Sequence, residues 1–397
     1  MAAIFSWKPF AYFALFFAFT LTPLVTIAGR RHRRLFFLSI LLLTAKVQYD
    51  GELGYTTNTT WFACLLMASD FLLLADVQLE RELHRPEEGS GRRWKQGTGF
   101  LDEKTLRQRF VWALDLLFTS GRGVGWAYQP RHLRPQLPDI PKSTFLIRRT
   151  LLLLFIFLTL DFANAHQHSN PVFCARLGLV NAGWLWRLTG TACWAALAMS
   201  VLSIPHLLLG IAAVGFDISR PRDWPPLFGR LEDLTSVRAF WARGWHQYLR
   251  RSLTAHGRYL ANSVLKLPPR SLSTRCIVIS TAFFLSGLVH QLGERVPLKR
   301  VGYGPGGGSL MFFSLQPLAI GSETLVSLYF QRTSLSPAWR RALGTAWVAA
   351  WFVLTLPIMQ DPLLRTGEMD PKFHTSFVTW VLGTGWDLEH SRICLFE

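Results

Sequence analysis

The sequence predicts an all-α, polytopic integral membrane protein with about 8–10 transmembrane or re-entrant helices. Half of its 397 residues are apolar, whereas only 17% carry a charge, well below the share that is usual in soluble domains. The apolar residues are concentrated in blocks whose lengths approach those of membrane-spanning helices. Lys and Arg gather in some of the intervening segments and avoid others, as expected when loops alternate between the two sides of a membrane.

Eight apolar runs are long enough, or nearly so, to form the spanning helices. With approximate ends they are 9–29, 35–48, 61–79, 146–165, 187–216, 274–294, 309–330 and 341–360. Pro205 lies inside the fifth run and predicts a kink or a break there. Two shorter amphipathic segments, 110–128 and 373–386, are expected to be re-entrant or to lie at the membrane surface. No internal repeat divides the sequence, so we expect one domain over 1–397.

The distribution of basic residues predicts how these helices are oriented. The formal net charge of +17 would indicate a nucleic-acid partner in a soluble protein, but basic cytoplasmic loops explain it here. Lys and Arg number four in 30–34, none in 49–60, fourteen in 80–149, one in 166–186 and eleven in 217–275. This alternation places 30–34, 80–149 and 217–275 in the cytoplasm. The 49–60 loop is then lumenal, and the sequon at Asn58 predicts its glycosylation.

Residues 236–251, SVRAFWARGWHQYLRR, predict an amphipathic helix at the cytoplasmic face. The apolar residues that would share one side of this helix are Trp241, Trp245 and Leu249. The polar residues that would share another side are Arg243, His246 and Arg250. Such a helix could bury its tryptophans and offer His246 and the arginines to a cavity, or it could be a plain interfacial helix.

His290 lies within the apolar stretch AFFLSGLVHQLGE, residues 282–294. An imidazole inside a membrane span is costly and by default indicates a function, although it could also be a structural link between helices. Ser286 and Glu294 are each four residues from His290 and share its helical face. Either could hydrogen-bond the imidazole and select its tautomer.

The remaining patterns predict neither a metal site nor a bound cofactor. His166-Gln167-His168 offers too few ligands for a metal, and the glycine-rich stretch 302–308 lacks the lysine and the preceding strand of a phosphate-binding loop. The sequence has no GxSxG nucleophile elbow, which argues against a serine hydrolase. We therefore expect no permanently bound cofactor and no metal.

Three sequence elements together resemble the wax-synthase-like branch of the membrane-bound O-acyltransferases. They are RGVGW at 122–126, FWxxxWHQ at 240–247 and SGLVH at 286–290. Their order, and the 44 residues that separate His246 from His290 (290 − 246), make the set more specific than any one element. The resemblance is carried by 110–300 and is greatest to fungal acetyltransferases of terpenoid and meroterpenoid pathways.

The resemblance implies an enzyme of secondary metabolism that transfers an acetyl group from acetyl-CoA to a hydroxyl of a hydrophobic terpenoid or meroterpenoid. The reaction would take place in a buried tunnel of a multi-pass protein of the endoplasmic reticulum membrane. The invariant histidine of the family corresponds to His290, the expected general base. The second polar position of the family, often asparagine, corresponds to His246, which could be a second base, an orienting donor or a ligand of the thioester carbonyl.

Contacts with the two substrates are expected from residues near these histidines. Arg243, Arg250 and Arg251 are the expected partners of the CoA phosphates, with Arg238 and Arg258 as alternatives. The other residues expected to bind acyl-CoA or the acceptor are Trp241, Trp245, Gln247, Ser286 and Glu294. The expected partners are thus acyl-CoA, a hydrophobic alcohol and the lipid bilayer, without nucleic acid.

Two other functions use the same features. A wax or sterol ester synthase would need the same chemistry with a long-chain acyl-CoA. A transporter would use His290 and Glu294 as a proton relay, although the sequence lacks the repeated halves common in transporters. The topology is difficult for an acyltransferase, because the 274–294 span would place His290 near the lumenal end, whereas acyl-CoA comes from the cytoplasm.

Overall fold

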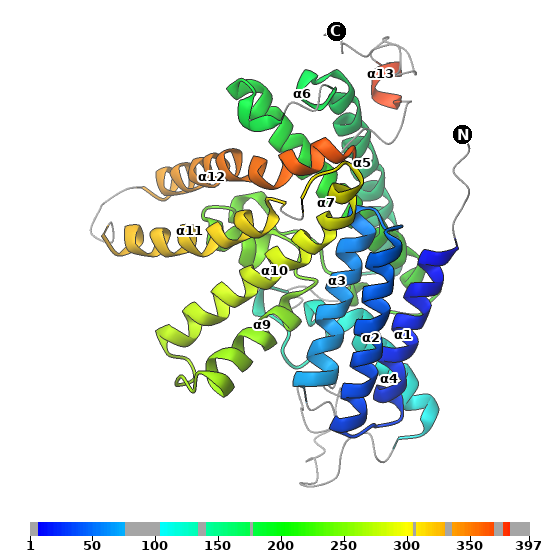
Figure 1. The fold of residues 1–397 in the computed structure, drawn as a ribbon. Coiled ribbons are helices and arrows are strands. Elements are labelled where there is room, and N and C mark those ends of the chain that lie inside the picture. Colours follow the sequence, from blue (N-terminus) through cyan, green and yellow to red (C-terminus); the bar gives the residue numbers. More distant parts are fainter. Residues whose placement is uncertain are drawn as a thin grey trace. The chain divides into compact units, whose positions relative to one another are not determined.

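The structure is a computed structural model that describes residues 7–75, 104–133, 140–174, 178–304, 307–329, 336–368 and 376–381. These ranges contain helices joined by turns and no strand (Figure 1), which confirms the all-α prediction. The chain divides into two compact units. The first unit consists of Met1–Arg134 and Gln247–Val296, and the second unit consists of Pro135–His246 and Pro297–Glu397. That 1–397 forms a single functional domain stays a prediction.

The first unit is built on a bundle of long helices. Its helices are α1 (Lys8–Val25), α2 (Arg30–Asp50), α3 (Tyr55–Ser69), α4 (Leu106–Thr119), α9 (Arg250–Arg258) and most of α10 (Leu272–Arg300). α1, α2 and α3 lie side by side (Figure 1), and the wholly buried rings of Phe16 and Trp61 meet between them. The Trp61 indole N–H donates to Thr44 Oγ1 at 3.0 Å, so this aromatic core leaves its polar atom satisfied.

Two helices of the first unit end in wider, π-helical turns. α3 continues into the π turn Asp70–Leu74, and α9 continues into the π turn Tyr259–Val264. A π turn inserts one extra residue into the helical hydrogen-bond ladder and is often found at functional sites. These two turns carry several of the residues that line the pocket described below.

The second unit is built on two long antiparallel pairs of helices. Its helices are α5 (Lys142–Ser169), α6 (Pro171–Cys174), α7 (Trp184–Gly215), α8 (Val237–Ala239), α11 (Ser309–Tyr329), α12 (Pro337–Thr366) and α13 (Phe377–Val381). α5 packs along α7, and α11 packs along α12. The Glu323 carboxylate accepts the backbone N–H groups of Val237 and Arg238 at 2.5 and 3.1 Å, which holds the start of α8 against α11.

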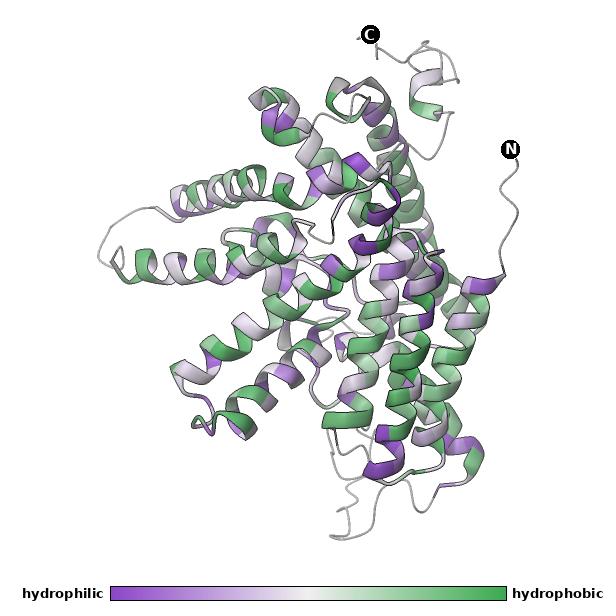
Figure 2. Ribbon diagram, viewed as in Figure 1, coloured by the Kyte–Doolittle hydropathy of each residue, from purple (hydrophilic) through white to green (hydrophobic). Residues whose placement is uncertain are grey.

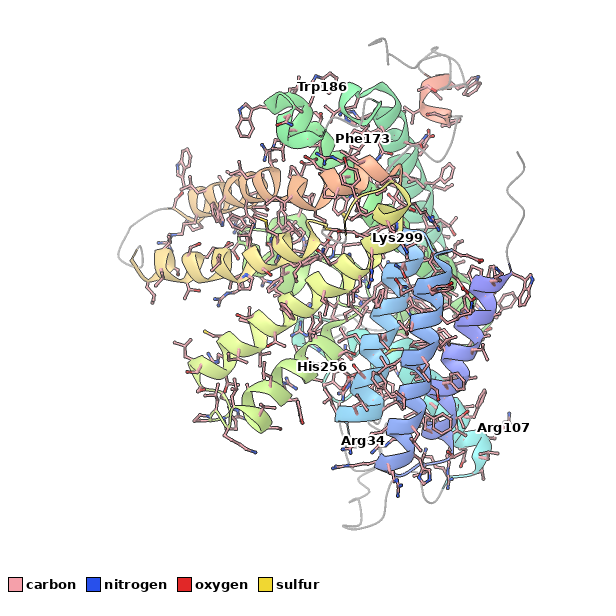
Figure 3. The ribbon with its side chains drawn as sticks, in the orientation of Figure 1. Arg34, Arg107, Phe173, Trp186, His256 and Lys299 are labelled. Atoms are coloured by element: carbon pink, nitrogen blue, oxygen red, sulfur yellow. The ribbon has the colours of Figure 1, made fainter. Side chains whose placement is uncertain are left out.

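The lengths and compositions of the helices confirm an integral membrane protein. Five of the described helices are long and apolar enough to cross a membrane: α1, α3 with its π turn, α7, α10 and α12. Hydrophobic residues run along most of their length (Figure 2), whereas charged side chains such as Arg34, Arg107 and Lys299 lie near helix ends (Figure 3). Each of the eight apolar runs expected from the sequence falls on a helix where it is described. Of the two shorter segments, 110–128 includes most of α4, and 373–386 lies largely outside the described residues.

Two of these helices differ from the expectation in ways that matter for the site. α7 is one continuous helix that includes Pro205, so of the kink or break expected there the break does not occur, and the kink stays a prediction. α10 has 29 residues and extends to Arg300, beyond the predicted end at residue 294. His290 therefore lies about 15 Å before the C-terminal end of its helix, at 1.5 Å per residue, rather than at the end of a short span.

Candidate functional site

The segment that carries Trp241, Trp245 and His246 is not one helix, contrary to the sequence prediction. A π turn over Phe240–Gly244 follows α8, and Trp245 is already extended, with ψ at 157°. Gly244 explains the interruption, because its carbonyl accepts the Gly229 N–H at 2.9 Å and a Cβ on it would overlap the Leu234 side chain. The predicted stripe of residues four apart therefore does not form, and Leu249 lies beyond the turn.

The two tryptophans nevertheless meet, in an aromatic cluster inside the second unit. The rings of Trp241 and Trp245 are 6.3 Å apart, and the Trp241 indole donates to the wholly buried Gln316 Oε1 at 3.0 Å. The cluster is completed by Phe228, Phe240, Phe312, Phe313 and Phe352. His246 lies at its edge, with its ring centroid 5.5 Å from that of Trp245. The cluster gives His246 an apolar surrounding suited to a hydrophobic molecule.

His290 lies in the first unit, on α10, and its partner is a tyrosine that the sequence analysis did not single out. Its Nδ1 is 2.9 Å from the Tyr55 hydroxyl, at the first residue of α3. Ser286 and Glu294 lie one turn before and one turn after His290 on the same helix, and Glu294 is wholly buried. His246 belongs to the second unit, and its ring contacts described above are with residues of that unit.

Asn58, the predicted glycosylation site, is wholly buried inside the first unit, and its glycosylation stays a prediction. It lies within α3 rather than in a loop. Its Nδ2 donates to the carbonyl oxygens of Leu292 and Gly293 at 3.1 and 3.2 Å, and its Oδ1 accepts from Gln48 at 2.7 Å. A glycan would have to be attached to the same nitrogen that joins α3 to α10.

A basic pocket of about 360 Å³ opens in the first unit between the π turn that follows α3, the 121–128 turn, and α9 with the π turn that follows it. Four arginines line it, Arg122, Arg250, Arg251 and Arg258, together with one carboxylate, that of Asp70. Polar side chains of Tyr128, Thr254, Tyr259, Asn262 and Ser263 complete the lining. A concave site lined by several guanidinium groups and neutral donors suits an anion that carries phosphate groups.

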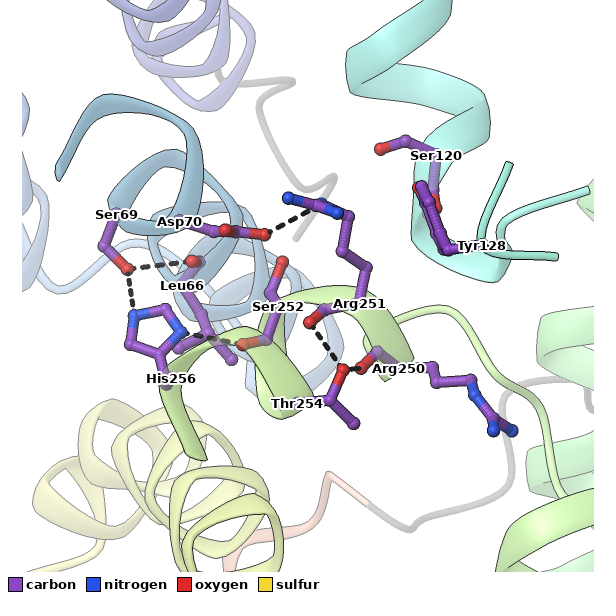
Figure 4. Close-up of polar contacts among 10 residues, drawn as sticks. All are labelled: Leu66, Ser69, Asp70, Ser120, Tyr128, Arg250, Arg251, Ser252, Thr254 and His256. Carbon is purple, nitrogen blue, oxygen red and sulfur yellow. Dashed lines mark hydrogen bonds and ion pairs between the residues drawn. The ribbon is translucent and has the colours of Figure 1, made fainter. Parts of the chain in front are cut away.

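The two neighbouring arginines of α9 have different surroundings (Figure 4). Arg251 is buried, and its Nε is 3.3 Å from Oδ2 of the buried Asp70. Its guanidinium also lies over the rings of Tyr128 and Phe71, at 5.0 and 5.7 Å. A guanidinium so surrounded is already neutralised and packed, which is a structural role.

Arg250 points away from Arg251 (Figure 4) and has no carboxylate partner among the contacts described for it. Its Nη1 donates to Gln247 Oε1 at 2.9 Å. Burial, and then the nearby Arg258 guanidinium, lower the pKa of Arg250 below its ordinary value. Two like charges that share a partly buried pocket are stabilised when an anion binds between them.

The RGVGW element forms a tight turn whose first residue, Arg122, lines the pocket. Gly123 and Gly125 have φ angles of 73° and 75°, the left-handed region that glycine enters most readily. The Trp126 indole donates to Thr119 at 3.0 Å, and the Tyr128 hydroxyl donates to the Ser120 carbonyl. This tight turn places the buried Arg122 side chain in the wall of the pocket.

α9 is also fastened to α3 beside the pocket. His256 Nδ1 donates to the Ser252 carbonyl at 2.7 Å, and its Nε2 is 2.9 Å from the Ser69 hydroxyl (Figures 3 and 4). Ser69 immediately precedes Asp70, the partner of Arg251. The histidine therefore helps to fix the two helices whose residues form the Asp70–Arg251 ion pair.

The structure brings together only some of the residues expected to bind the substrates. Arg250, Arg251 and Gln247 share the first unit with Arg258 and His290. The exposed Arg243 lies in the second unit with Trp241, Trp245 and His246. Asp70, Arg122 and Tyr55 were not expected at a site. Asp70 carried a signal, since a carboxylate inside an apolar run is costly unless paired, whereas no pattern connected Tyr55 to His290.

Comparisons with known proteins agree on one family. Residues 224–315 match the membrane bound O-acyl transferase family. Acetyltransferase ple2 of Rhodocybe pseudopiperita is 32% identical over 317 residues, which cover 79% of this chain and 79% of that protein. Acetyltransferase eriL of Hericium erinaceus is 33% identical over 350 residues, covering 86% and 87%. Acetyltransferase TRI7 of Fusarium sporotrichioides is 27% identical over 275 residues, covering 61% of each. No solved structure matches the chain.

Proposed function

This chain belongs to the membrane-bound O-acyl transferase family, and on that premise we propose that it transfers an acetyl group from acetyl-CoA to a hydroxyl of a hydrophobic terpenoid or meroterpenoid. Its membership makes it an O-acyltransferase rather than a transporter. The observation that carries the choice of acetyl is that relatives named acetyltransferases match 79% and 86% of the chain at 32% and 33% identity. The relatives named above are all called acetyltransferases.

In the proposed mechanism, His290 is the general base. It takes the proton from the acceptor hydroxyl while that oxygen attacks the thioester carbonyl carbon. The carbon–sulfur bond then breaks, and the CoA thiolate receives the proton from the imidazolium. The acyl group thus passes to the alcohol, CoA leaves as the thiol, and the imidazole returns to its neutral form. No acyl-enzyme is needed, because a thioester is already activated.

The basic pocket is proposed to hold the phosphate groups of acetyl-CoA. Arg250 and Arg258 supply charge without a carboxylate partner among their described contacts, and Arg122 lines the same pocket. Guanidinium groups bind phosphate oxygens through paired, charge-assisted hydrogen bonds. The pocket and His290 both lie in the first unit, with α9 and α10 as consecutive helices of the chain.

The acceptor is proposed to be apolar and to reach the enzyme from the bilayer. The aromatic cluster around Trp241 and Trp245 is the kind of surface on which a polycyclic hydrocarbon skeleton packs. His246, at the edge of this cluster, is the second proposed catalytic residue, as a donor to the thioester carbonyl. Ser286 and Glu294, which lie one turn from His290 on the same helix, are proposed to contact the imidazole or the substrate bound beside it. We propose the endoplasmic reticulum as the membrane concerned.

Acetyl transfer by the purified protein tests this function. The full chain in detergent micelles is given radiolabelled acetyl-CoA and a panel of farnesol, a polycyclic sesquiterpene alcohol and a sterol, and ester formation is measured. We expect an acetyl ester with at least one terpenoid alcohol, and loss of that product in His290→Ala at an unchanged melting temperature. Palmitoyl-CoA, competing in the same assay, tests the wax or sterol ester synthase reading. Preferential formation of the palmitoyl ester, or full activity in His290→Ala, would contradict the proposal.

A further inference from the structure

The Tyr55 hydroxyl lies within hydrogen-bonding distance of one ring nitrogen of His290. Its hydroxyl is 2.9 Å from Nδ1, and the two rings are 6.3 Å apart at an interplanar angle of 33°. The residues are 235 positions apart in the chain, so the contact depends on how α3 and α10 pack. Because Nδ1 is engaged by Tyr55, proton transfer at this imidazole has to use Nε2.

The packing of α3 on α10 is fixed immediately beside this contact. Asn58, one turn after Tyr55, is wholly buried and donates to the backbone carbonyls of Leu292 and Gly293. Gly293 lets the helices approach closely, since a Cβ there would overlap Thr59. The hydrogen bonds of Asn58 therefore fix the distance between the Tyr55 hydroxyl and the His290 imidazole. A catalytic side chain needs neighbouring residues that hold it in position in this way.

We propose that Tyr55 is a positioning residue for His290, with its phenol oxygen accepting the Nδ1–H bond so that Nε2 is the atom that takes the proton of the acceptor alcohol. This inference rests on the proposed function of His290. A phenol hydroxyl can both accept and donate a hydrogen bond, so it fits the role. The neutral imidazole must carry its proton on Nδ1 if Nε2 is to act as a base, and the same Nδ1–H bond is kept when the imidazolium forms.

The pair is partly buried, which makes the contact important for the rate. A hydrogen bond in a low-dielectric site is electrostatically stronger than the same bond in water, and an imidazolium without an acceptor for its N–H would be costly there. The Tyr55 oxygen thus stabilises the charge that develops on His290 during the transfer, and it also fixes the plane of the ring. An orienting partner of this kind is worth about 10–100-fold at metal-ligating histidines.

The test compares Tyr55→Phe with wild type in the acetyl-transfer assay, using a terpenoid alcohol of the panel that the wild type acetylates. We expect kcat to fall by about 10–100-fold, with the KM for acetyl-CoA within about twofold of wild type, since Tyr55 is not among the residues that line the basic pocket. Tyr12→Phe is the matched control. It removes a hydroxyl that is bonded to Asp50 in the same unit and should leave kcat unchanged.

A second pair of variants separates positioning from general support of the fold. In a His290→Gln background, Tyr55→Phe should lower the residual rate no further, because its effect acts through His290. Replacement of Tyr55 by 3-fluorotyrosine, which keeps the shape but weakens the phenol oxygen as an acceptor, should give an intermediate kcat at an unchanged melting temperature. If Tyr55→Phe proves unstable, this variant alone decides the question.

Two outcomes would overturn the proposed role of Tyr55 while leaving the proposed function of the protein intact. One is wild-type kcat in folded Tyr55→Phe and in the fluorinated protein. The other is an equal loss from Tyr55→Phe in the His290→Gln background. A wild-type protein that acetylates nothing in the panel contradicts the proposed function instead, and the inference falls with it.

Discussion

The arginines of the basic pocket are chemically equal but differ in what they already contact. Arg250 and Arg258 both line the pocket, and each carries a positive charge that acts on the other. Loss of one charge-assisted contact to a phosphate costs about 1.5–3 kcal/mol, which corresponds to roughly a tenfold to hundredfold change in binding. We therefore expect Arg250→Gln and Arg258→Gln each to raise the KM for acetyl-CoA by about tenfold or more, with kcat little changed.

Two measurements keep this prediction specific. Arg107→Gln is the matched control, because Arg107 is exposed and is not among the residues that line the pocket. Added salt should raise the KM of the wild type more than that of either pocket variant, since each variant has one fewer charged contact to screen. An equal rise of the KM for acetyl-CoA in all three variants would mean that only the net charge of the protein affects acetyl-CoA binding.

Arg251 should respond in a different way, because it is tied to Asp70. Asp70→Asn removes the carboxylate charge without changing the shape of the side chain and leaves the buried guanidinium without its counter-charge. Breaking a buried ion pair in this way costs about 3–5 kcal/mol, so we expect a clear loss of thermal stability in detergent. Arg251→Gln in addition to Asp70→Asn should recover part of the loss. A stable Asp70→Asn protein with a raised KM for acetyl-CoA would instead make Asp70 and Arg251 part of the binding surface.

At the scale of residues, sequence patterns pointed to His290, Arg250 and Gln247 but not to Tyr55, whose hydroxyl lies beside His290 in the structure. Periodicity along one helix offered Ser286 and Glu294 as partners of His290, because such patterns report only neighbours on the same element. The partner found at Nδ1 is Tyr55, which comes from another helix. Asn58 matched a sequon of three residues, yet its burial depends on contacts with α10 that a local motif does not contain.

At the scale of elements, the close approach between the RGVGW turn and the start of α9 shapes the pocket. A Cβ on Gly121 would overlap the backbone carbonyl of Tyr248, which cannot move as a side-chain end could. Overpacking of this kind costs about 1–3 kcal/mol. We expect Gly121→Ala to lower the melting temperature and to weaken acetyl-CoA binding, because Arg122 is displaced with the turn.

Gly29→Ala is the matched control for this prediction, since nothing lies within 4 Å of the added carbon at Gly29. Both variants are compared by thermal unfolding in detergent and by the KM for acetyl-CoA. If Gly121→Ala and Gly29→Ala behave alike, the turn does not support the pocket.

The helices themselves were largely predictable, because long apolar runs leave a membrane-embedded chain few other solutions. Their interruptions were not. The amphipathic pattern of 236–251 is helical in period, but Gly244 packs on Leu234 and ends the helix through a tertiary contact. At Pro205, by contrast, the sequence suggested an interruption and α7 continues. In a membrane protein, neighbouring structure can satisfy the backbone carbonyl that loses its hydrogen bond to the proline position.

At the scale of the whole molecule, the two proposed substrates reach the enzyme from different phases. The helices expose large apolar side chains such as Leu154, Phe155 and Leu325, as a surface solvated by lipid does. A hydrophobic alcohol is concentrated in that lipid, whereas the charged acetyl-CoA stays in water, and its binding is proposed for the basic pocket.

The rate should therefore follow the mole fraction of the alcohol in the membrane rather than its bulk concentration. With the enzyme in lipid vesicles at fixed total alcohol, a tenfold increase in total lipid should lower the rate at subsaturating alcohol by about the same factor, because partition into the bilayer sets the local concentration. The apparent KM for acetyl-CoA should not change over this series. A water-soluble alcohol that the enzyme accepts is the control, and its rate should be independent of the amount of lipid. Equal insensitivity of both alcohols to lipid would mean that the acceptor enters from water, which would exclude a route through the bilayer.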